Sequence, residues 1–233
     1  MTRELNGPVI DGGFTRERAW FKGMPTFGDP DYIFFRDDFM GIAIDVTNDW
    51  TLVEDSSSTQ TIEADTLGGR LKLFATADDE GTSLQGNEIF QVSAGFDTWF
   101  EIKLSCNEPT EVDICLGLTV NFSTNPEAML TSADRIVFQK DDGTDNIYSI
   151  TEFSGEETKK DTGIDLGTSQ DVKLGFRVFG DTSVVFYVNR VAVATHTTNI
   201  VTDQNLALGM MMLCGDANDH FISVDYIQCI QTR

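Results

Sequence analysis

Residues 172–188 read VKLGFRVFGDTSVVFYV, and this stretch decides the fold. β-Branched and aromatic residues fill residues 172–179 and 183–188, which is typical of strands. The three residues between them, Gly180-Asp181-Thr182, fit a short hairpin connection. The stretch therefore predicts two antiparallel strands.

Segments of the same kind recur through residues 37–233. Residues 99–106 read WFEIKLSC, where Glu101, Lys103 and Ser105 alternate with apolar residues, as in a strand with one buried face. Turn residues separate such segments at intervals of about 8 to 12 residues. A short helical turn is expected near residues 125–132, because Pro126 fits a helix start. We expect strands at residues 39–46, 50–54, 59–64, 70–75, 89–92, 99–106, 113–122, 135–140, 147–153, 172–179, 183–188, 191–196, 206–213 and 221–230.

Many short strands without long helices predict an all-β fold, a jelly-roll sandwich of two antiparallel sheets. No internal repeat is visible, which argues against a propeller or a solenoid. The chain has 233 residues, within the range of one large β domain, and 40% are hydrophobic, enough for a substantial core. We divide the chain into an extended N-terminal arm, residues 1–36, and the sandwich, residues 37–233.

Four segments of the sandwich carry a resemblance to a known family. They are residues 37–39 (DDF), 68–73 (GGRLKL), 184–194 (VVFYVNRVAVA) and 221–227 (FISVDYI). Together they resemble the concanavalin A-like lectin/glucanase jelly roll, including its laminin-G-like relatives. Arg190 replaces the glycine that is usual in one turn of that family. The family hosts lectins, glucanases, adhesion modules and viral structural domains, so the resemblance implies the fold and leaves the function open.

The charge is divided unevenly between the arm and the sandwich. The formal net charge is −22. Residues 1–36 hold five basic and five acidic residues, which leaves 11 basic and 33 acidic residues in residues 37–233. A body this acidic repels phosphate backbones, so we expect no nucleic-acid partner. The acidity is explained either by solubility alone or by a body that faces solvent while the neutral arm faces a partner.

The arm is rich in aromatic residues although it cannot form regular structure. It contains three of the five prolines and five glycines, which exclude a long helix or a central strand. Disordered segments are usually poor in aromatics, so we expect the arm to pack against the sandwich or to dock on another chain. The residues that we expect to contact a protein partner are Arg16, Arg18, Trp20, Phe21, Phe27, Tyr32, Phe34 and Phe35.

The cysteines and histidines suggest no metal centre. Four cysteines occur without CxxC spacing, and buried thiols are the favoured interpretation, with a Cys214–Cys229 disulfide as the alternative. We interpret His196 and His220 as solvated side chains. Two oxygen-rich loops, residues 141–145 and 216–219, are the only candidates for calcium. We expect neither a metal nor a cofactor.

No catalytic pattern is complete. The glucanases of the resembled fold place Glu-x-Asp-x-x-Glu on one strand, and the nearest match here is Glu111-Val112-Asp113, with Leu116 where the last Glu would stand. Neither histidine lies beside a nucleophile motif, and no phosphate-binding loop is present. The sequence therefore predicts a protein that binds rather than an enzyme.

Three functions remain from the sequence. The first is a structural protein of a virion, assembled in the host cytoplasm, because the acidic jelly roll with its arm resembles tailed-phage capsid decoration or cement proteins in style. Its partners would be a major capsid protein and further copies of the chain in a homo-oligomer. The second is a lectin-like carbohydrate-binding module of an adhesin or tail fibre, and the third a glycoside hydrolase. No apolar run of membrane length exists, and the N-terminus does not read as a signal peptide.

Overall fold

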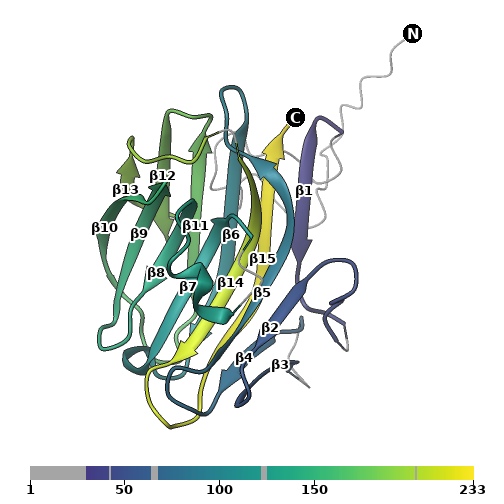
Figure 1. Ribbon diagram of the computed structural model, residues 1–233, viewed down its shortest axis with the longest axis vertical. Coiled ribbons are helices and arrows are strands. Elements are labelled where there is room, and N and C mark those ends of the chain that lie inside the picture. Colours follow the sequence, from purple (N-terminus) through teal and green to yellow (C-terminus); the bar gives the residue numbers. More distant parts are fainter. Residues whose placement is uncertain (1–29, 42, 64–67, 122–124, 203) are drawn as a thin grey trace.

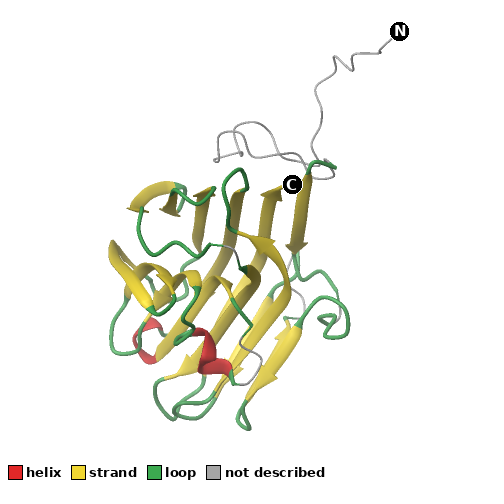
Figure 2. Ribbon diagram, turned by 45° about the horizontal axis from the view of Figure 1, so that its top comes forward, coloured by secondary structure: helices red, strands yellow, loops and turns green. Residues whose placement is uncertain are grey.

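The computed structural model describes residues 30–41, 43–63, 68–121, 125–202 and 204–233. These residues form two antiparallel sheets that pack face to face (Figure 1). Figure 2 shows the two layers after a turn, with only short helical segments outside them. The predicted all-β jelly-roll sandwich is confirmed.

The first sheet, sheet A, has eight strands in the order β13-β12-β11-β6-β15-β4-β3, with β1 also paired to β15. Its strands are β1 (Tyr32–Asp37), β3 (Ser58–Ile62), β4 (Leu71–Ala75), β6 (Asp97–Cys106), β11 (Val172–Phe179), β12 (Ser183–Val188), β13 (Val191–His196) and β15 (His220–Thr232). The long strand β15 therefore holds β6 on one side and both β4 and β1 on the other.

The second sheet, sheet B, has seven strands in the order β10-β9-β8-β7-β14-β5-β2. Its strands are β2 (Thr51–Glu54), β5 (Gly81–Gln91), β7 (Val112–Thr119), β8 (Arg135–Lys140), β9 (Asn146–Phe153), β10 (Glu156–Asp165) and β14 (Asn205–Cys214). Two 3-10 helices, η1 (Pro109–Glu111) and η2 (Pro126–Met129), precede β7 and β8, and η2 is the helical turn expected near Pro126.

Aromatic side chains join the two sheets in the core. Phe100 of β6 stacks on Phe176 of β11 with ring centres 4.7 Å apart, and Phe176 lies 5.6 Å from Phe186 of β12. Phe186 meets Phe138 of the opposite sheet edge to face at 5.1 Å. All four rings are buried, because alternate residues of each strand point inward.

One predicted strand is corrected. The strand expected at residues 39–46 is wrong for the described residues there, because the strand runs earlier, as β1. Asp37 ends it: its carboxylate accepts a hydrogen bond from the Phe39 backbone N–H at 2.8 Å and one from Trp50 Nε1 at 2.9 Å. Phe39 then adopts a φ of 51° and turns its ring into the core.

Strand β10 was missed altogether. Its sequence, EETKKDTGID, carries six charged residues, and most of its side chains are exposed. It is an edge strand, paired only with β9 among the strands of sheet B. Charge on an edge strand blocks pairing with another chain, so this strand lacks the apolar signal on which a sequence prediction depends.

The four cysteines are free and buried, as the favoured interpretation predicted. Burial raises the pKa of the Cys106 thiol to about 11 and that of Cys115 to about 12. No helix among the described residues has the length and apolar character needed to cross a membrane.

Candidate functional site

The outer face of sheet B carries polar side chains across β8, β9 and β10. Ile136 and Phe138 of β8 point into the core, so the residues between them point outward. The register then sets three cross-strand rows, Arg135–Glu152–Glu157, Val137–Ile150–Lys159 and Gln139–Tyr148–Asp161. The outermost part of this sheet is therefore a charged and aromatic surface.

Ion pairs fix the side chains of this surface. Arg135 donates from Nε to Glu152 Oε2 at 2.7 Å and from Nη2 to Glu157 Oε2 at 3.0 Å. Lys159 Nζ lies 2.7 Å from Asp141 Oδ2 and 4.3 Å from the centre of the Tyr148 ring. The side chains are held in position before any ligand arrives, which lowers the entropy cost of binding.

Two carboxylates lie at the end of the same face. Asp113 belongs to β7, whose paired register with β8 ends at Ile114 and Lys140, and Asp141 is the first residue after β8. The charge of Asp141 acts on Asp113, so the two carboxyls lie near each other. Asp113 Oδ1 accepts a hydrogen bond from the Asp142 backbone N–H at 2.7 Å.

Their surroundings move the pKa values of the two carboxyls in opposite directions. Burial, together with the nearby Asp142 charge, raises the pKa of Asp113 despite its backbone hydrogen bond. Burial alone would also raise the pKa of Asp141, but the hydrogen bonds from Lys159 and Gln139 outweigh it and lower this pKa. Such a divergence assigns an acid and a base in many enzymes.

The segment formed by η2 and the following Leu130, which we call the strap, covers another part of the outer face of sheet B. Behind η2, the apolar residues Cys115, Met129, Val137, Ile150, Met211 and Leu213 form a buried cluster. Arg135 ties the strap down, because its Nη1 donates to the carbonyl oxygens of Met129, at 3.3 Å, and Leu130. The open part of the face is thus confined to Gln139 of β8, Tyr148 and Glu152 of β9, the outward side chains of β10, and the carboxyls of Asp113 and Asp141.

Of the residues that align with the glucanase motif, Glu111, Asp113 and Leu116, only one lies on this face. Glu111 lies in η1, outside the strand, so the period-2 argument does not hold for it. Leu116 points into the core. Asp113 alone reaches the outer face, and Asp141 lies directly after β8, so no single-strand motif could include both.

Both histidines are buried, so their interpretation as solvated side chains is wrong. His196 is 0% exposed, and burial lowers its pKa to about 4. His220 is 5% exposed, and its Nε2 lies 2.7 Å from Asp216 Oδ1. Asp216 belongs to residues 216–219, one of the two loops proposed as calcium sites. Its carboxylate also accepts hydrogen bonds from Asn218. No group of three or more potential metal ligands gathers in the described part of the chain.

The predicted partner-binding residues fall into two groups. Arg16, Arg18, Trp20, Phe21 and Phe27 lie outside the described residues. Tyr32, Phe34 and Phe35 belong to β1, which the structure places within sheet A. Phe35 packs inward on Trp50 at 5.1 Å, whereas Tyr32 and Phe34 face outward beside Trp99. Whether these residues contact a partner stays a prediction.

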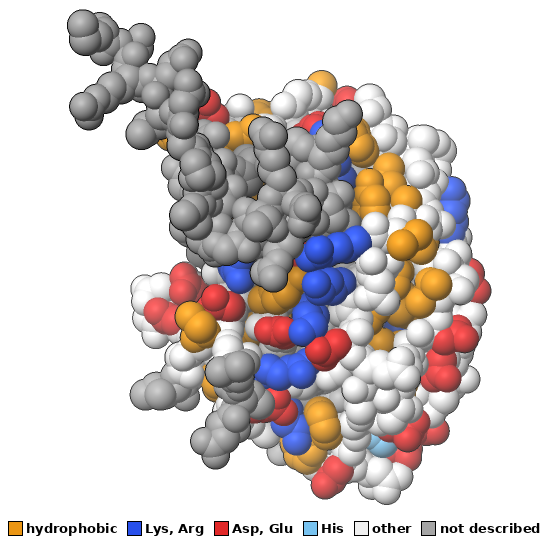
Figure 3. Space-filling model, turned by 180° about the vertical axis from the view of Figure 1, so that it is seen from behind, with side chains coloured by type: hydrophobic (Ala, Val, Ile, Leu, Met, Phe, Trp, Pro, Cys, Tyr) orange, Lys and Arg blue, Asp and Glu red, His pale blue; other side chains and the backbone are white. Residues whose placement is uncertain are grey.

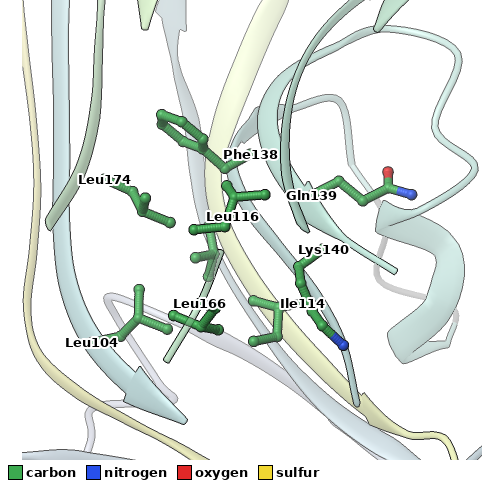
Figure 4. A pocket seen from close by; sticks show the side chains of 9 residues that line it. Leu104, Ile114, Leu116, Phe138, Gln139, Lys140, Leu166 and Leu174 are labelled. Carbon is green, nitrogen blue, oxygen red and sulfur yellow. The ribbon is translucent and has the colours of Figure 1, made fainter. Parts of the chain in front are cut away.

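The interior contains a cavity too small for a ligand. Leu104, Leu166 and Leu174 line it from one side, facing Ile114 and Leu116 (Figure 4). Its volume is about 10 Å³, which is scarcely room for one water molecule. This cavity therefore cannot hold a sugar ring or a larger ligand.

No family model and no curated protein matches the sequence. Solved structures nevertheless share the fold. A Bacteroides ovatus mixed linkage glucan GH16 protein, in complex with its product, is 10% identical, with a TM-score of 0.61 over 83% of this chain and 98% of that chain. A Bacillus licheniformis β-glucanase is 15% identical, with a TM-score of 0.58 over 86% and 98%. A Shewanella oneidensis protein of unknown function is 17% identical, with a TM-score of 0.60 over 100% and 97%.

The chain therefore has the jelly-roll fold of the GH16 glucanases, as the resemblance implied. The expectation that it is not an enzyme is corrected, because the structures that share its fold include several glucanases and a lichenase.

Proposed function

We propose that this chain binds a polysaccharide on the outer face of sheet B and hydrolyses it with Asp113 and Asp141. The observation that carries the proposal is the pair itself, two carboxyls at the ends of neighbouring strands whose surroundings shift their pKa values apart. The fold shared with glucanases supports it.

The two pKa shifts have the directions that the two roles require. Glycoside hydrolysis uses one carboxylic acid to protonate the leaving oxygen and one carboxylate as nucleophile or base, about 5 to 9.5 Å apart. Asp113, whose pKa is raised, would be the acid. Asp141, whose pKa is lowered by its hydrogen bonds with Lys159 and Gln139, would be the nucleophile or base. Asp113 at the start of β7 and Asp141 directly after β8 would bring their carboxyls within this range.

The binding surface adjoins this pair. Sugar rings pack against aromatic side chains, and their hydroxyl groups exchange hydrogen bonds with amides and carboxylates. Tyr148 and Gln139 lie in one cross-strand row next to Asp141, and Glu152 lies beyond them on β9. A polysaccharide chain laid across β8, β9 and β10 would contact all of them.

Affinity electrophoresis through gels that contain a polysaccharide tests the binding step. Mixed-linkage β-glucan is the first choice, since a protein with this fold was solved with a product of that glucan. We expect retardation of the wild type and loss of most of it in Tyr148→Ala and Gln139→Ala. Thr59→Ala, an exposed residue on β3 of sheet A, is the control and should migrate like the wild type. Equal retardation of all variants would place the ligand elsewhere.

The viral role stays a separate prediction. It depends mainly on arm residues that lie outside the described part of the chain. The fold is compatible with a polysaccharide-binding protein on the surface of a virion, because a fold does not determine where a protein acts.

A further inference from the structure

The outer face of sheet A gathers most of the described cations. Twelve lysines and arginines lie in the described residues, and seven of them are on this face, although the chain has a net charge of −22. The seven are Arg36, Arg70, Lys72, Lys103, Lys173, Arg177 and Arg190. Figure 3 shows Lys and Arg side chains forming a column on this side, with Asp and Glu among them.

The centre of the column is an ion-pair network. Asp171 Oδ1 lies 2.7 Å from Arg70 Nη2, and its Oδ2 lies 2.9 Å from Lys103 Nζ. Lys103 Nζ also lies 2.5 Å from Asp225 Oδ2. The carboxylates Asp171 and Asp225 are 40% and 31% exposed, so they remain open to hydrogen-bond donors from outside.

Two lysines on either side of this network have no carboxylate partner. Within the described residues, no Asp or Glu oxygen lies at ion-pair distance from Lys72 or Lys173. Lys173 faces Lys103 directly across β11 and β6. Lys72 Nζ lies over the rings of Phe221, at 3.9 Å, and Phe74, at 4.8 Å.

Charges of both signs surround Lys173. Its pKa is lowered, first by burial and then by the charge of Arg190; Lys103 adds to this effect, whereas Glu101 and Asp225 act against it. Burial and the two neighbouring cations therefore outweigh the carboxylates near Lys173.

The turn that positions Arg190 has a strained backbone, which indicates a functional role for the Arg190 side chain. Asn189 and Arg190 form the two-residue connection of β12 and β13, with φ values of 48° and 71°. Asn tolerates a positive φ, but Arg does so at a cost that glycine would avoid. Asn189 also anchors the turn to Lys173, through its backbone N–H at 2.8 Å and its side-chain oxygen at 3.0 Å. Retained strain of this kind is found where a side chain has a function.

We infer that the outer face of sheet A is a second binding site, and that its ligand is an anionic polysaccharide that carries sulfate or carboxylate groups. The anionic groups would bind Lys173 and Lys72, while sugar hydroxyls would donate hydrogen bonds to Asp171 and Asp225. A nucleic acid fits less well, because a duplex extends past this face and would lie along a body that holds 33 acidic and 11 basic residues. This site is independent of the carboxylate pair on sheet B.

Dextran sulfate and unmodified dextran form a matched pair of probes for the full chain, since they differ only in charge. We expect the wild type to bind dextran sulfate, more weakly as salt rises, and not to bind dextran. Lys173→Gln and Lys72→Gln should each weaken binding about three- to fivefold. Lys173→Arg should retain it because the charge is kept. Lys160→Gln, which removes an equal charge from β10 of the other sheet, should bind like the wild type.

Equal binding of dextran and dextran sulfate, or equal weakening by Lys160→Gln, would overturn the inference. So would tighter binding to duplex DNA than to dextran sulfate at the same salt concentration. Asp113→Asn should leave the affinity for dextran sulfate unchanged, so a failure of the sheet B proposal can be told apart from a failure of this one. Thermal unfolding of each variant establishes that it is folded.

Discussion

His196 Nε2 lies 2.9 Å from Ser149 Oγ in the interior of the sandwich, where both side chains are fully buried. The other ring nitrogen lies 2.9 Å from Thr151 Oγ1, whose hydroxyl donates to the Thr198 carbonyl oxygen at 3.0 Å. These contacts fit a neutral imidazole that donates from Nδ1 and accepts at Nε2. The histidine thereby links β13 of sheet A to β9 of sheet B.

Acidification should destabilise the fold through this histidine. Its pKa is about 4 in the folded chain, against an ordinary value of 6.5, so its contribution is complete above pH 6.5 and is lost as the pH falls towards 4. The expected loss in the free energy of unfolding is about 3 kcal/mol. Urea unfolding across this range measures it, with His196→Gln as the control that removes the titration. An equal fall in stability for the wild type and His196→Gln would contradict the assignment.

Arg135 should be essential for the strap over sheet B. The guanidinium is 5% exposed and contacts both Glu152 and the carbonyl oxygens of η2, so its removal leaves a poorly solvated carboxylate and loosens the strap. We expect Arg135→Met to reduce the free energy of unfolding by about 3 kcal/mol in urea titrations. The double variant Arg135→Met, Glu152→Leu should recover a large part of this loss, because no unpaired charge remains. No recovery would show that the packing of the strap, rather than the ion pair, sets the cost.

The two carboxyls of the proposed site should titrate apart. Carbon-13 NMR of the aspartate side chains should place the pKa of Asp113 above 3.8 and that of Asp141 below it. Lys159→Met removes the cation that stabilises ionised Asp141, so it should raise the Asp141 pKa by more than it changes that of Asp113. Two carboxyls with the same pKa would remove the basis for separate acid and base roles.

Replacement of Phe186 should be among the most destabilising substitutions in the core. Its ring lies against Phe138, Phe176 and His196 at centre distances of 5.1, 5.6 and 4.9 Å, and it is fully buried. Truncation to Ala should cost about 3 to 5 kcal/mol of stability, measured by denaturant unfolding. Val185→Ala, the preceding and outward-facing residue of β12, is the control and should cost far less.

The strands that could be predicted are those in which apolar and polar residues alternate. Residues 99–106 and 172–188 form β6, β11 and β12 as expected, because one face of each strand is apolar. Strand β9 was also expected, at residues 147–153, but its sequence does not reveal which face is buried: Ser149 and Thr151 point inward to His196, while Tyr148 and Ile150 point outward. Polar residues that satisfy one another inside the core invert the usual pattern, and the sequence carries no sign of the partner.

The candidate site was largely hidden for a similar reason. Asp113 was noticed within a single-strand motif, but Asp141 was read as part of an acidic loop. Their relation depends on the register of β7 and β8, which only the folded chain reveals. Likewise, Lys72 and Lys173 are about a hundred residues apart in sequence, and sheet A brings them to one face through β4, β15, β6 and β11.

The release of reducing ends from mixed-linkage β-glucan, by the wild type and by Asp113→Asn, tests the proposed function most directly. We predict measurable release by the wild type and a fall of at least about a hundredfold in Asp113→Asn, because the general acid is lost while the fold is kept. Asp181→Asn, which removes an exposed carboxylate from the turn between β11 and β12 of sheet A, should retain activity. Equal release by wild type and Asp113→Asn, or no release by the wild type from this glucan or any other polysaccharide supplied, would contradict the account.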